Sequence, residues 1–260
     1  MTIRSLLQHV GIDLTGKDIY VGDRLVDPAS STAIGAPVKN QLAIPGLRVA
    51  STWQPPTLDD FAHATVQAFD QTLTNTGVVL IKVNDLGIHL LSTAMIKPPE
   101  DVLAITSTEG SYARADSIYE GIVRHRSGYA ANADAIVYER KPVAGMRTDS
   151  IFLAGREVHR ATDGRAVMMD NRHAKKVLLG TAGTKDRKVT KADVKDAVEQ
   201  YIPSPKDSGR LMPWNEHVRD ACMLALAYLL DLKKTQVQAA ALGHRFAELV
   251  EEAAHQETAA

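Results

Sequence analysis

Four residues at the ends of expected secondary-structure elements could together hold divalent cations. Asp70 and Glu139 each close an apolar stretch that predicts a β-strand. His217 and Asp220 are three residues apart in the first turns of an expected helix, so they share one face of it. Carboxylates that converge repel one another unless cations bind, and oxygen ligands suit Mg²⁺ or Mn²⁺. Two such ions about 4 Å apart can activate a water molecule and stabilise the leaving oxygen of a phosphodiester.

These side chains converge only if the elements that carry them meet at one edge of a sheet. The order of elements predicts an α/β fold with a five-stranded mixed sheet, in which an antiparallel meander joins parallel strands and helices flank the sheet. If the first and fourth strands are neighbours, Asp70 and Glu139 emerge side by side. The strands are expected over residues 63–70, 78–83, 88–95, 135–139 and 166–169, the helices over 112–125, 148–160, 191–201 and 215–232, and a short basic turn or helix over 172–179.

This regular pattern occupies only part of the chain. Residues 1–56 are expected to form an N-terminal extension of unknown role, with a helix over 3–10, a strand over 18–21 and proline-containing connections. Residues 57–232 are expected to form the domain that carries the four candidate residues. Residues 233–260 are expected to form a C-terminal helical tail.

The composition is that of an ordinary globular protein and leaves nucleic-acid binding open. The 260 residues carry a formal net charge of −1, whereas nucleic-acid-binding proteins are usually basic. That total is an average, because residues 110–200 hold 17 Lys and Arg against 12 Asp and Glu. The single cysteine, Cys222, excludes a disulfide framework and a CxxC zinc site, and we expect it in the core. Since we find neither a signal peptide nor an apolar run long enough to span a bilayer, we expect a cytoplasmic protein without membrane contact.

Several segments resemble the RuvC-type Holliday-junction resolvases, which are ribonuclease-H-like nucleases. The opening resembles that family most visibly, with an apolar strand ending in Asp70, a polar turn, and Gly77 seven residues on before the next strand. A second acidic strand, the helix after it, a basic connector and an acidic helix with an Ala-rich continuation follow in the family's order. The similar segments are 68–80, 136–139, 148–156, 171–180, 191–198 and 217–227, within roughly residues 61–232.

The resemblance implies an activity and a site. It implies a crossover junction endodeoxyribonuclease with a ribonuclease-H-like fold, which acts as a homodimer on two opposed strands of a four-way DNA junction. Asp70, Glu139, His217 and Asp220 would be its catalytic, metal-binding set, holding Mg²⁺ or Mn²⁺, with two ions in each active site. A bacteriophage source would suit this compact enzyme, in which case the host's cytoplasm is its location.

Two positions depart from the family's pattern. Many members carry an aromatic residue three positions after the second acid, where it stacks at the junction centre, but this chain has Pro142. The handling of the crossover, and any sequence preference tied to it, therefore does not carry over. The fourth ligand is His217 rather than aspartate, which lowers the negative charge of the site and leaves the choice between Mg²⁺ and Mn²⁺ open.

Basic residues near the expected site are candidates for contacts with DNA phosphates. Some follow the second acid directly, and others lie in the basic connector and in a loop bounded by glycine and threonine. Both positions would border the acidic site, where phosphate contacts are needed. The candidates are Arg140, Lys141, Arg147, Lys175, Lys176, Lys185, Arg187 and Lys188.

Other residues and other functions compete with this interpretation. Asp85 follows the second strand but is explained by a hairpin turn, and Asp13 lies too far from Glu139 to fit the compact meander. Glu216 is expected on a different helix face, as an N-terminal charge. The alternatives for the whole protein are a ribonuclease-H-like nuclease for an RNA–DNA hybrid or a flap, or a non-catalytic junction-binding protein of the same fold.

Overall fold

The computed structural model describes residues 17–21, 24–26, 47–51, 53–130, 132–140, 148–184, 188–205, 209 and 212–258. The chain divides into two compact units, residues 1–54 and 55–260. In the first unit β1 (Lys17–Val21) pairs antiparallel with both β2 (Arg24–Val26) and β3 (Leu47–Ser51). The strand expected over 18–21 is therefore confirmed as β1, and the helix expected over 3–10 lies outside the described residues.

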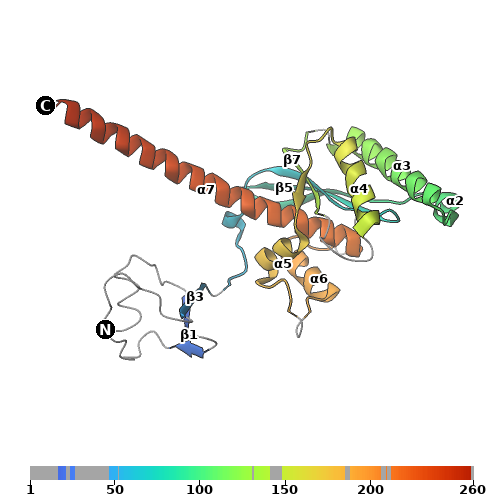
Figure 1. Ribbon diagram of the computed structural model, residues 1–260, viewed down its shortest axis with the longest axis horizontal. Helices are drawn as coiled ribbons and strands as arrows, with labels where there is room; N and C mark the ends of the chain where they lie inside the picture. The colour runs from blue at the N-terminus through green and yellow to red at the C-terminus, as the bar shows by residue number, and fades with distance from the viewer. Residues whose placement is uncertain are drawn as a thin grey trace. The chain divides into compact units, whose positions relative to one another are not determined.

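The second unit is built on a five-stranded mixed sheet with the order β6-β5-β4-β7-β8 (Figure 1). Strands β4, β5 and β6 form the expected antiparallel meander, and β7 and β8 continue it in parallel with β4. The central strands are rich in β-branched residues, which favour a pleated and buried backbone. The strands are β4 (Thr65–Asp70), β5 (Thr76–Asn84), β6 (Gly87–Ile96), β7 (Ala135–Glu139) and β8 (Val167–Met169). The expected fold class is confirmed.

Helices cover both faces of the sheet (Figure 1). One face packs against α3 and α4, and the other against α7, with α5 and α6 packed beside α7. A short 3-10 helix, Leu58–Asp60, precedes the sheet, and a π-helical segment, Arg126–Ala130, follows α3. The helices are α2 (Glu100–Ala104), α3 (Thr108–His125), α4 (Thr148–Ala161), α5 (Asn171–Leu179), α6 (Lys191–Glu199) and α7 (Glu216–Thr258).

Relative to the sequence expectation, the structure adds one helix, decides one alternative and joins two expected helices into one. The short α2 was not predicted, since five residues carry too little periodicity. The basic segment left open between turn and helix is α5, because Asp170 accepts from the His173 backbone N–H (3.0 Å) and Gly180 ends the helix with φ 72°. The expected helix 215–232 and the expected tail are one continuous helix, α7.

The alternation of β4 directs its acidic end toward α7. Val66 and Ala68 are fully buried in the core that α7 shares, and Asp70 follows them on the same face. The opposite face of β4 carries Phe69 into the core formed with α3 and α4. Cys222, as expected, is fully buried on α7, where burial raises the pKa of its thiol.

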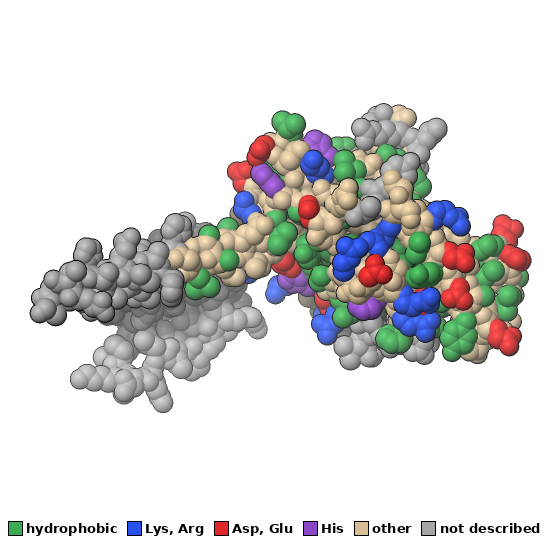
Figure 2. All heavy atoms as spheres, turned by 90° about the horizontal axis from the view of Figure 1, so that it is seen from above, with side chains coloured by type: hydrophobic (Ala, Val, Ile, Leu, Met, Phe, Trp, Pro, Cys, Tyr) green, Lys and Arg blue, Asp and Glu red, His purple; other side chains and the backbone are tan. Residues whose placement is uncertain are grey.

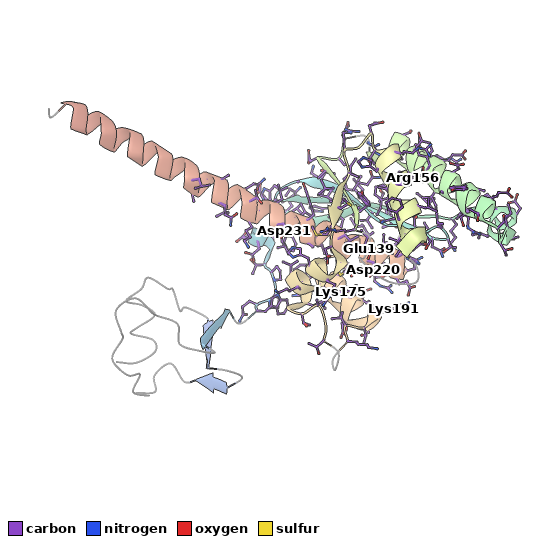
Figure 3. All side chains as sticks on the ribbon, in the orientation of Figure 1. Glu139, Arg156, Lys175, Lys191, Asp220 and Asp231 are labelled. Carbon is purple, nitrogen blue, oxygen red and sulfur yellow. The ribbon has the colours of Figure 1, made fainter. Side chains whose placement is uncertain are left out.

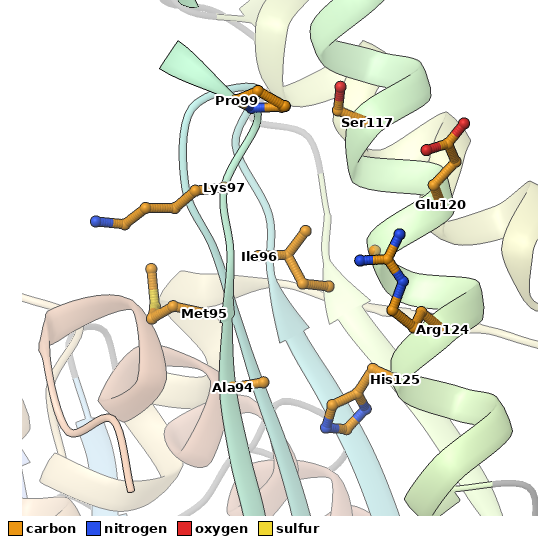
Figure 4. A pocket seen from close by; sticks show the side chains of 10 residues that line it. Ala94, Met95, Ile96, Lys97, Pro99, Ser117, Glu120, Arg124 and His125 are labelled. Atoms are coloured by element: carbon orange, nitrogen blue, oxygen red, sulfur yellow. The ribbon is translucent and has the colours of Figure 1, made fainter.

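On the other face, α3 lies close to the edge strand β6. A Cβ atom added at Gly121 would lie 2.3 Å from Ile96 Cγ2, so only glycine permits this approach. Figure 4 shows the Ile96 side chain directed from β6 toward α3. Ile96 is one of the residues that line an open hollow of about 460 Å³ between the two elements. Within the described part of the chain, no helix is both long and apolar enough to cross a bilayer.

Candidate active site

Asp70 meets the first turn of α7 at the carboxyl end of β4. His217 Nδ1 donates to Asp70 Oδ2 at 2.7 Å, although 147 residues separate them in the chain. Asp70 is 6% exposed and pairs in register with Gly77 of β5. A Cβ atom at Gly77 would lie 2.3 Å from the carbonyl carbon and oxygen of His217. Gly77 therefore permits the backbone of α7 to pack against the strand beside Asp70, which explains a glycine seven residues after the acid.

Gly77→Ala is expected to destabilise the fold and to separate His217 from Asp70. The added methyl group meets helix backbone, which cannot rotate away, and overpacking of this kind costs about 1–3 kcal/mol. Thermal unfolding of the full chain measures the loss. Gly243→Ala is the matched control, since nothing lies within 4 Å of that position on the exposed part of α7. If Gly77→Ala and Gly243→Ala unfold at the same temperature, the close contact is not a constraint.

Glu139 is held at the end of β7 by two amide side chains. Asn171 Nδ2, at the start of α5, donates to Glu139 Oε1 at 3.0 Å. Gln71 Nε2 donates to the Glu139 carbonyl oxygen at 2.8 Å, and the Glu139 N–H donates to Gln71 Oε1 at 3.1 Å. Burial, and then the charge of Asp70, raise the pKa of Glu139 from 4.5 to about 7, against the opposing effect of the Asn171 hydrogen bond.

Asp220 lies near the same carboxylates, one turn along α7 from His217. Burial, and then the charge of Asp70, raise the pKa of Asp220 from 3.8 to about 6, while Lys175 and His217 act in the opposite direction. The hydrogen bond to Asp70 raises the pKa of His217, more than its burial lowers it. The charge of Asp220 also raises the pKa of Glu139. Figure 3 labels Glu139 and Asp220 close together, with Lys175 nearby. The structure thus brings the four predicted residues together at one edge of the sheet.

The donor chemistry of this cluster fits a divalent cation. Three carboxylates with little exposure repel one another. Burial first, and then the charge of Asp70, raise the pKa values of Glu139 and Asp220, which disfavours their charged forms. A bound cation would relieve that disfavour. As the side chains stand, no three His, Cys, Asp or Glu residues among those described are grouped so as to hold a metal ion. One reason is visible, because the His217 hydrogen bond occupies an oxygen of Asp70.

Part of the expected basic set borders this cluster. Lys175 on α5 is near enough to Asp220 to lower its pKa, and an open hollow of about 410 Å³ beside it is lined by Arg172 and Lys188. Arg140 and Lys176 are exposed. On the face shown in Figure 2, Lys and Arg side chains stand among acidic and apolar ones rather than in one basic field. The remaining candidates, Lys141, Arg147, Lys185 and Arg187, lie outside the described residues, as does Pro142.

The competing acids are placed apart from the cluster or at its border. Asp85 occupies the turn between β5 and β6, with its side chain 93% exposed. Glu216 forms an ion pair with Lys191 of α6, and its Oε1 lies 4.0 Å from His217 Nε2. Asp13 lies outside the described residues.

Sequence reasoning missed the two amides that hold Glu139. Gln71 is fully buried directly after Asp70, and Asn171 opens the basic helix α5. Neither carries a charge, and their partner is 68 and 32 residues away in the chain. The only available signal was a glutamine inside an apolar environment, where an amide must find hydrogen-bond partners.

The sheet order and the placement of the helices define the class: this is the ribonuclease-H-like fold of RuvC-type resolvases. The chain is similar to Thermus thermophilus RuvC in complex with Holliday junction substrate, with 17% identity over 66% of this chain and 97% of that one and a TM-score of 0.51. A second structure of Thermus thermophilus RuvC gives 17% identity, coverage of 66% and 96%, and a TM-score of 0.50.

The yeast mitochondrial Holliday junction resolvase Ydc2 is more distant, with 12% identity, coverage of 70% and 85%, and a TM-score of 0.45. Comparison with protein-family models gave no match, and neither did comparison with the sequences of curated proteins. At these identities the structural likeness establishes the fold. The activity depends on the chemistry of the cluster.

Proposed function

We propose that this protein is a metal-dependent, structure-selective DNA endonuclease that resolves four-way junctions. The observation that carries the proposal is the meeting of Asp70, Glu139, His217 and Asp220 at the carboxyl edge of the sheet. A protein that only binds DNA has no use for carboxylates that repel one another beside phosphates. The solved structure of RuvC with a Holliday junction adds the substrate class to a fold that this chain shares.

The four residues have distinct parts in this proposal. Asp70 and Glu139, on neighbouring parallel strands, would hold one or two divalent cations together with Asp220. His217 would turn from Asp70 to complete the ligand set or to accept a proton. When bound, such cations supply Lewis-acid stabilisation of the phosphodiester and a water molecule of lowered pKa. The oxygen donors suit Mg²⁺ or Mn²⁺, and a His217 nitrogen in the ligand set would shift the preference toward Mn²⁺.

Phosphate contacts are proposed for the basic residues beside the cluster. Arg172 and Lys188 line the hollow next to Lys175, so a DNA backbone held there would place its neighbouring phosphate toward Asp220. Arg140 and Lys176 would extend this contact on either side. The same role is proposed for Lys141, Arg147, Lys185 and Arg187.

Arg172→Ala combined with Lys188→Ala is expected to weaken junction binding and to reduce its dependence on salt. Each lost phosphate contact lowers the slope of log K against log salt concentration by about 1. Titrating a labelled junction at several salt concentrations, with EDTA to prevent cleavage, measures the slope. Lys234→Ala, an exposed lysine farther along α7, is the control. An unchanged slope in the double variant would remove the hollow from the DNA-binding surface.

The assembly and organisation of the protein are also proposals. A homodimer would place two such sites on opposed strands of one junction. Residues 57–232 would form the nuclease domain between an extension, 1–56, and a helical tail, 233–260; the division of the chain at 54/55 supports the first of these boundaries. We further propose a cytoplasmic location, in a bacterial host if the source is a bacteriophage.

The substrate class is tested by comparing cleavage of a four-way junction, a flap, an RNA–DNA hybrid and a linear duplex of matched sequence. Junction-selective cleavage with Mg²⁺ or Mn²⁺ is the expected result. Preference for the hybrid or the flap would favour another ribonuclease-H-like nuclease. Tight junction binding without cleavage in Mn²⁺ would favour a non-catalytic junction-binding protein.

A further inference from the structure

The buried side chain of Gln71 extends the pairing of β4 and β7 beyond the point where their backbones pair. The last backbone register of these strands is Phe69 with Tyr138. One step farther, the Gln71 amide donates to the carbonyl oxygen of Glu139 and accepts from its N–H, at 2.8 and 3.1 Å. One side-chain amide thereby satisfies both backbone groups of Glu139, which in a regular parallel ladder would bond to two different residues of the neighbouring strand. The ladder ends on the second acid of the site.

The side-chain amide of Gln71 is enclosed by protein and bonds to Glu139. The side chain is fully buried, and both of its described hydrogen bonds go to Glu139. Helix α4 covers it through Gly155, where an added Cβ atom would lie 3.5 Å from Gln71 Nε2 and 3.3 Å from Tyr138 Cε2. A buried amide that lost these partners would remain unsatisfied, at a cost of about 1–3 kcal/mol. The arrangement therefore holds the Glu139 backbone in one place.

Fixing the Glu139 backbone also fixes the carboxylate. Beyond the amide clamp, the next N–H, that of Arg140, donates to the Met169 carbonyl oxygen at 2.7 Å, so the strand end is held from both neighbouring strands. Asn171 then orients the Glu139 side chain through Oε1. The Glu139 carboxyl group also shares a side-chain hydrogen bond with Asp70, the other strand-end acid of the proposed cation site.

We infer that Gln71 is a positioning residue, which holds Glu139 where it binds a divalent cation together with Asp70. The inference rests on the proposed function, because it assigns Glu139 to a metal site. It adds a residue that carries no charge and acts through the backbone of Glu139 rather than as a metal ligand. Groups that orient metal ligands in this way typically contribute about 10–100-fold to metal affinity.

The test compares two buried glutamines four residues apart, Gln67 within β4 and Gln71 directly after it. The Gln67 side chain is also fully buried, but its amide contacts His125 (3.2 Å) on the α3 side of the sheet, away from the acids. Gln67→Met and Gln71→Met remove the same chemical group at the same burial. Binding of Mn²⁺ to the full chain is measured by the loss of the free-ion electron paramagnetic resonance signal, and stability by thermal unfolding.

Both variants are expected to lose stability, but only Gln71→Met is expected to bind Mn²⁺ about 10–100-fold more weakly. Hydrogen exchange of the Glu139 amide should also accelerate in Gln71→Met and stay unchanged in Gln67→Met. If Gln71→Met does not fold, Gln71→Asn keeps the amide on a side chain too short to make both bonds, and the same losses are expected.

Each other outcome has a definite meaning. Parent-like Mn²⁺ affinity in Gln71→Met, or an equal loss in Gln67→Met, would overturn the inference and leave the proposed function standing. A parent protein that binds Mn²⁺ but leaves junctions intact would overturn the proposed function, and the two variants would still decide the role of Gln71. A parent that binds no Mn²⁺ would overturn the inference directly.

Discussion

Asp70→Asn is expected to lower junction cleavage by about 1000-fold or more while leaving junction binding intact. Asparagine has nearly the same shape, so it can still accept the hydrogen bond of His217, but it removes the one charge that acts on Glu139, His217 and Asp220 alike. Loss of a metal ligand removes several kcal/mol of stabilisation of the transition state. Each 1.4 kcal/mol or so corresponds to a factor of ten in rate.

The measurement is single-turnover cleavage of a labelled four-way junction, with binding followed separately in EDTA. Asp85→Asn is the matched control, because the same substitution is made in an exposed hairpin turn of the same meander. That variant should cut at the parent's rate. An Asp70→Asn protein that cuts as fast as Asp85→Asn would show that the cluster is not the active site.

Glu139→Gln is expected to stabilise the metal-free protein at pH 8 while abolishing cleavage. Burial and the charges of Asp70 and Asp220 raise the pKa of Glu139 to about 7. Since one unit of pKa shift corresponds to about 1.4 kcal/mol, the ionised carboxylate opposes folding by on the order of 3 kcal/mol. Glutamine carries no charge and keeps the side-chain length. For a domain of this size the gain corresponds to a rise in melting temperature of roughly 5–10 °C.

Because the pKa of Glu139 is raised on folding, the stability difference between Glu139→Gln and the parent depends on pH. Between about pH 4.5 and 7 the folded protein holds a proton on Glu139 that the unfolded chain releases, so stability falls as the pH rises through this range. The advantage of Glu139→Gln over the parent should therefore be absent at pH 4 and complete at pH 8. Mg²⁺ or Mn²⁺ should stabilise the parent at pH 8 and not the variant.

Thermal unfolding across this pH range in EDTA makes the comparison, with Glu120→Gln on the exposed surface of α3 as the control. The control should follow the parent at every pH. A melting temperature of Glu139→Gln below that of the parent at pH 8 would mean that the carboxylates of the cluster do not oppose folding.

The sequence predicted those parts of the site that depend on short segments of the chain, such as the end of a strand, a turn or the spacing of residues along a helix. An acid at the end of an apolar strand, a polar turn and a second strand predicted the hairpin that carries Asp70, and the structure adds that Asp70 and Gly77 pair in register. The spacing of His217 and Asp220 placed both on one face of α7. That β7 lies beside β4 was only a condition of the sequence argument, and the structure meets it.

The remaining parts depend on contacts between distant segments. Nothing local shows that the Gln71 amide takes the place of backbone in the β4–β7 ladder, or that Asn171 reaches Glu139 from α5. The sequence analysis separated a helix over 215–232 from a tail, whereas the structure has one helix, α7. No glycine or proline lies between residues 216 and 242 to mark a helix end, so the separation had no local signal behind it. The hydrogen bond between Asp70 and His217 likewise requires the packing of α7 on Gly77.

The most direct test of the nuclease assignment is incubation of the purified full chain with a synthetic four-way junction, with Mg²⁺ or Mn²⁺ and, in parallel, with EDTA. We expect paired nicks in opposed strands that leave 5′-phosphates, only when the divalent ion is present, and no cleavage of a linear duplex of the same sequence. Intact junctions at saturating protein and metal, under conditions in which the protein binds the junction, would contradict it.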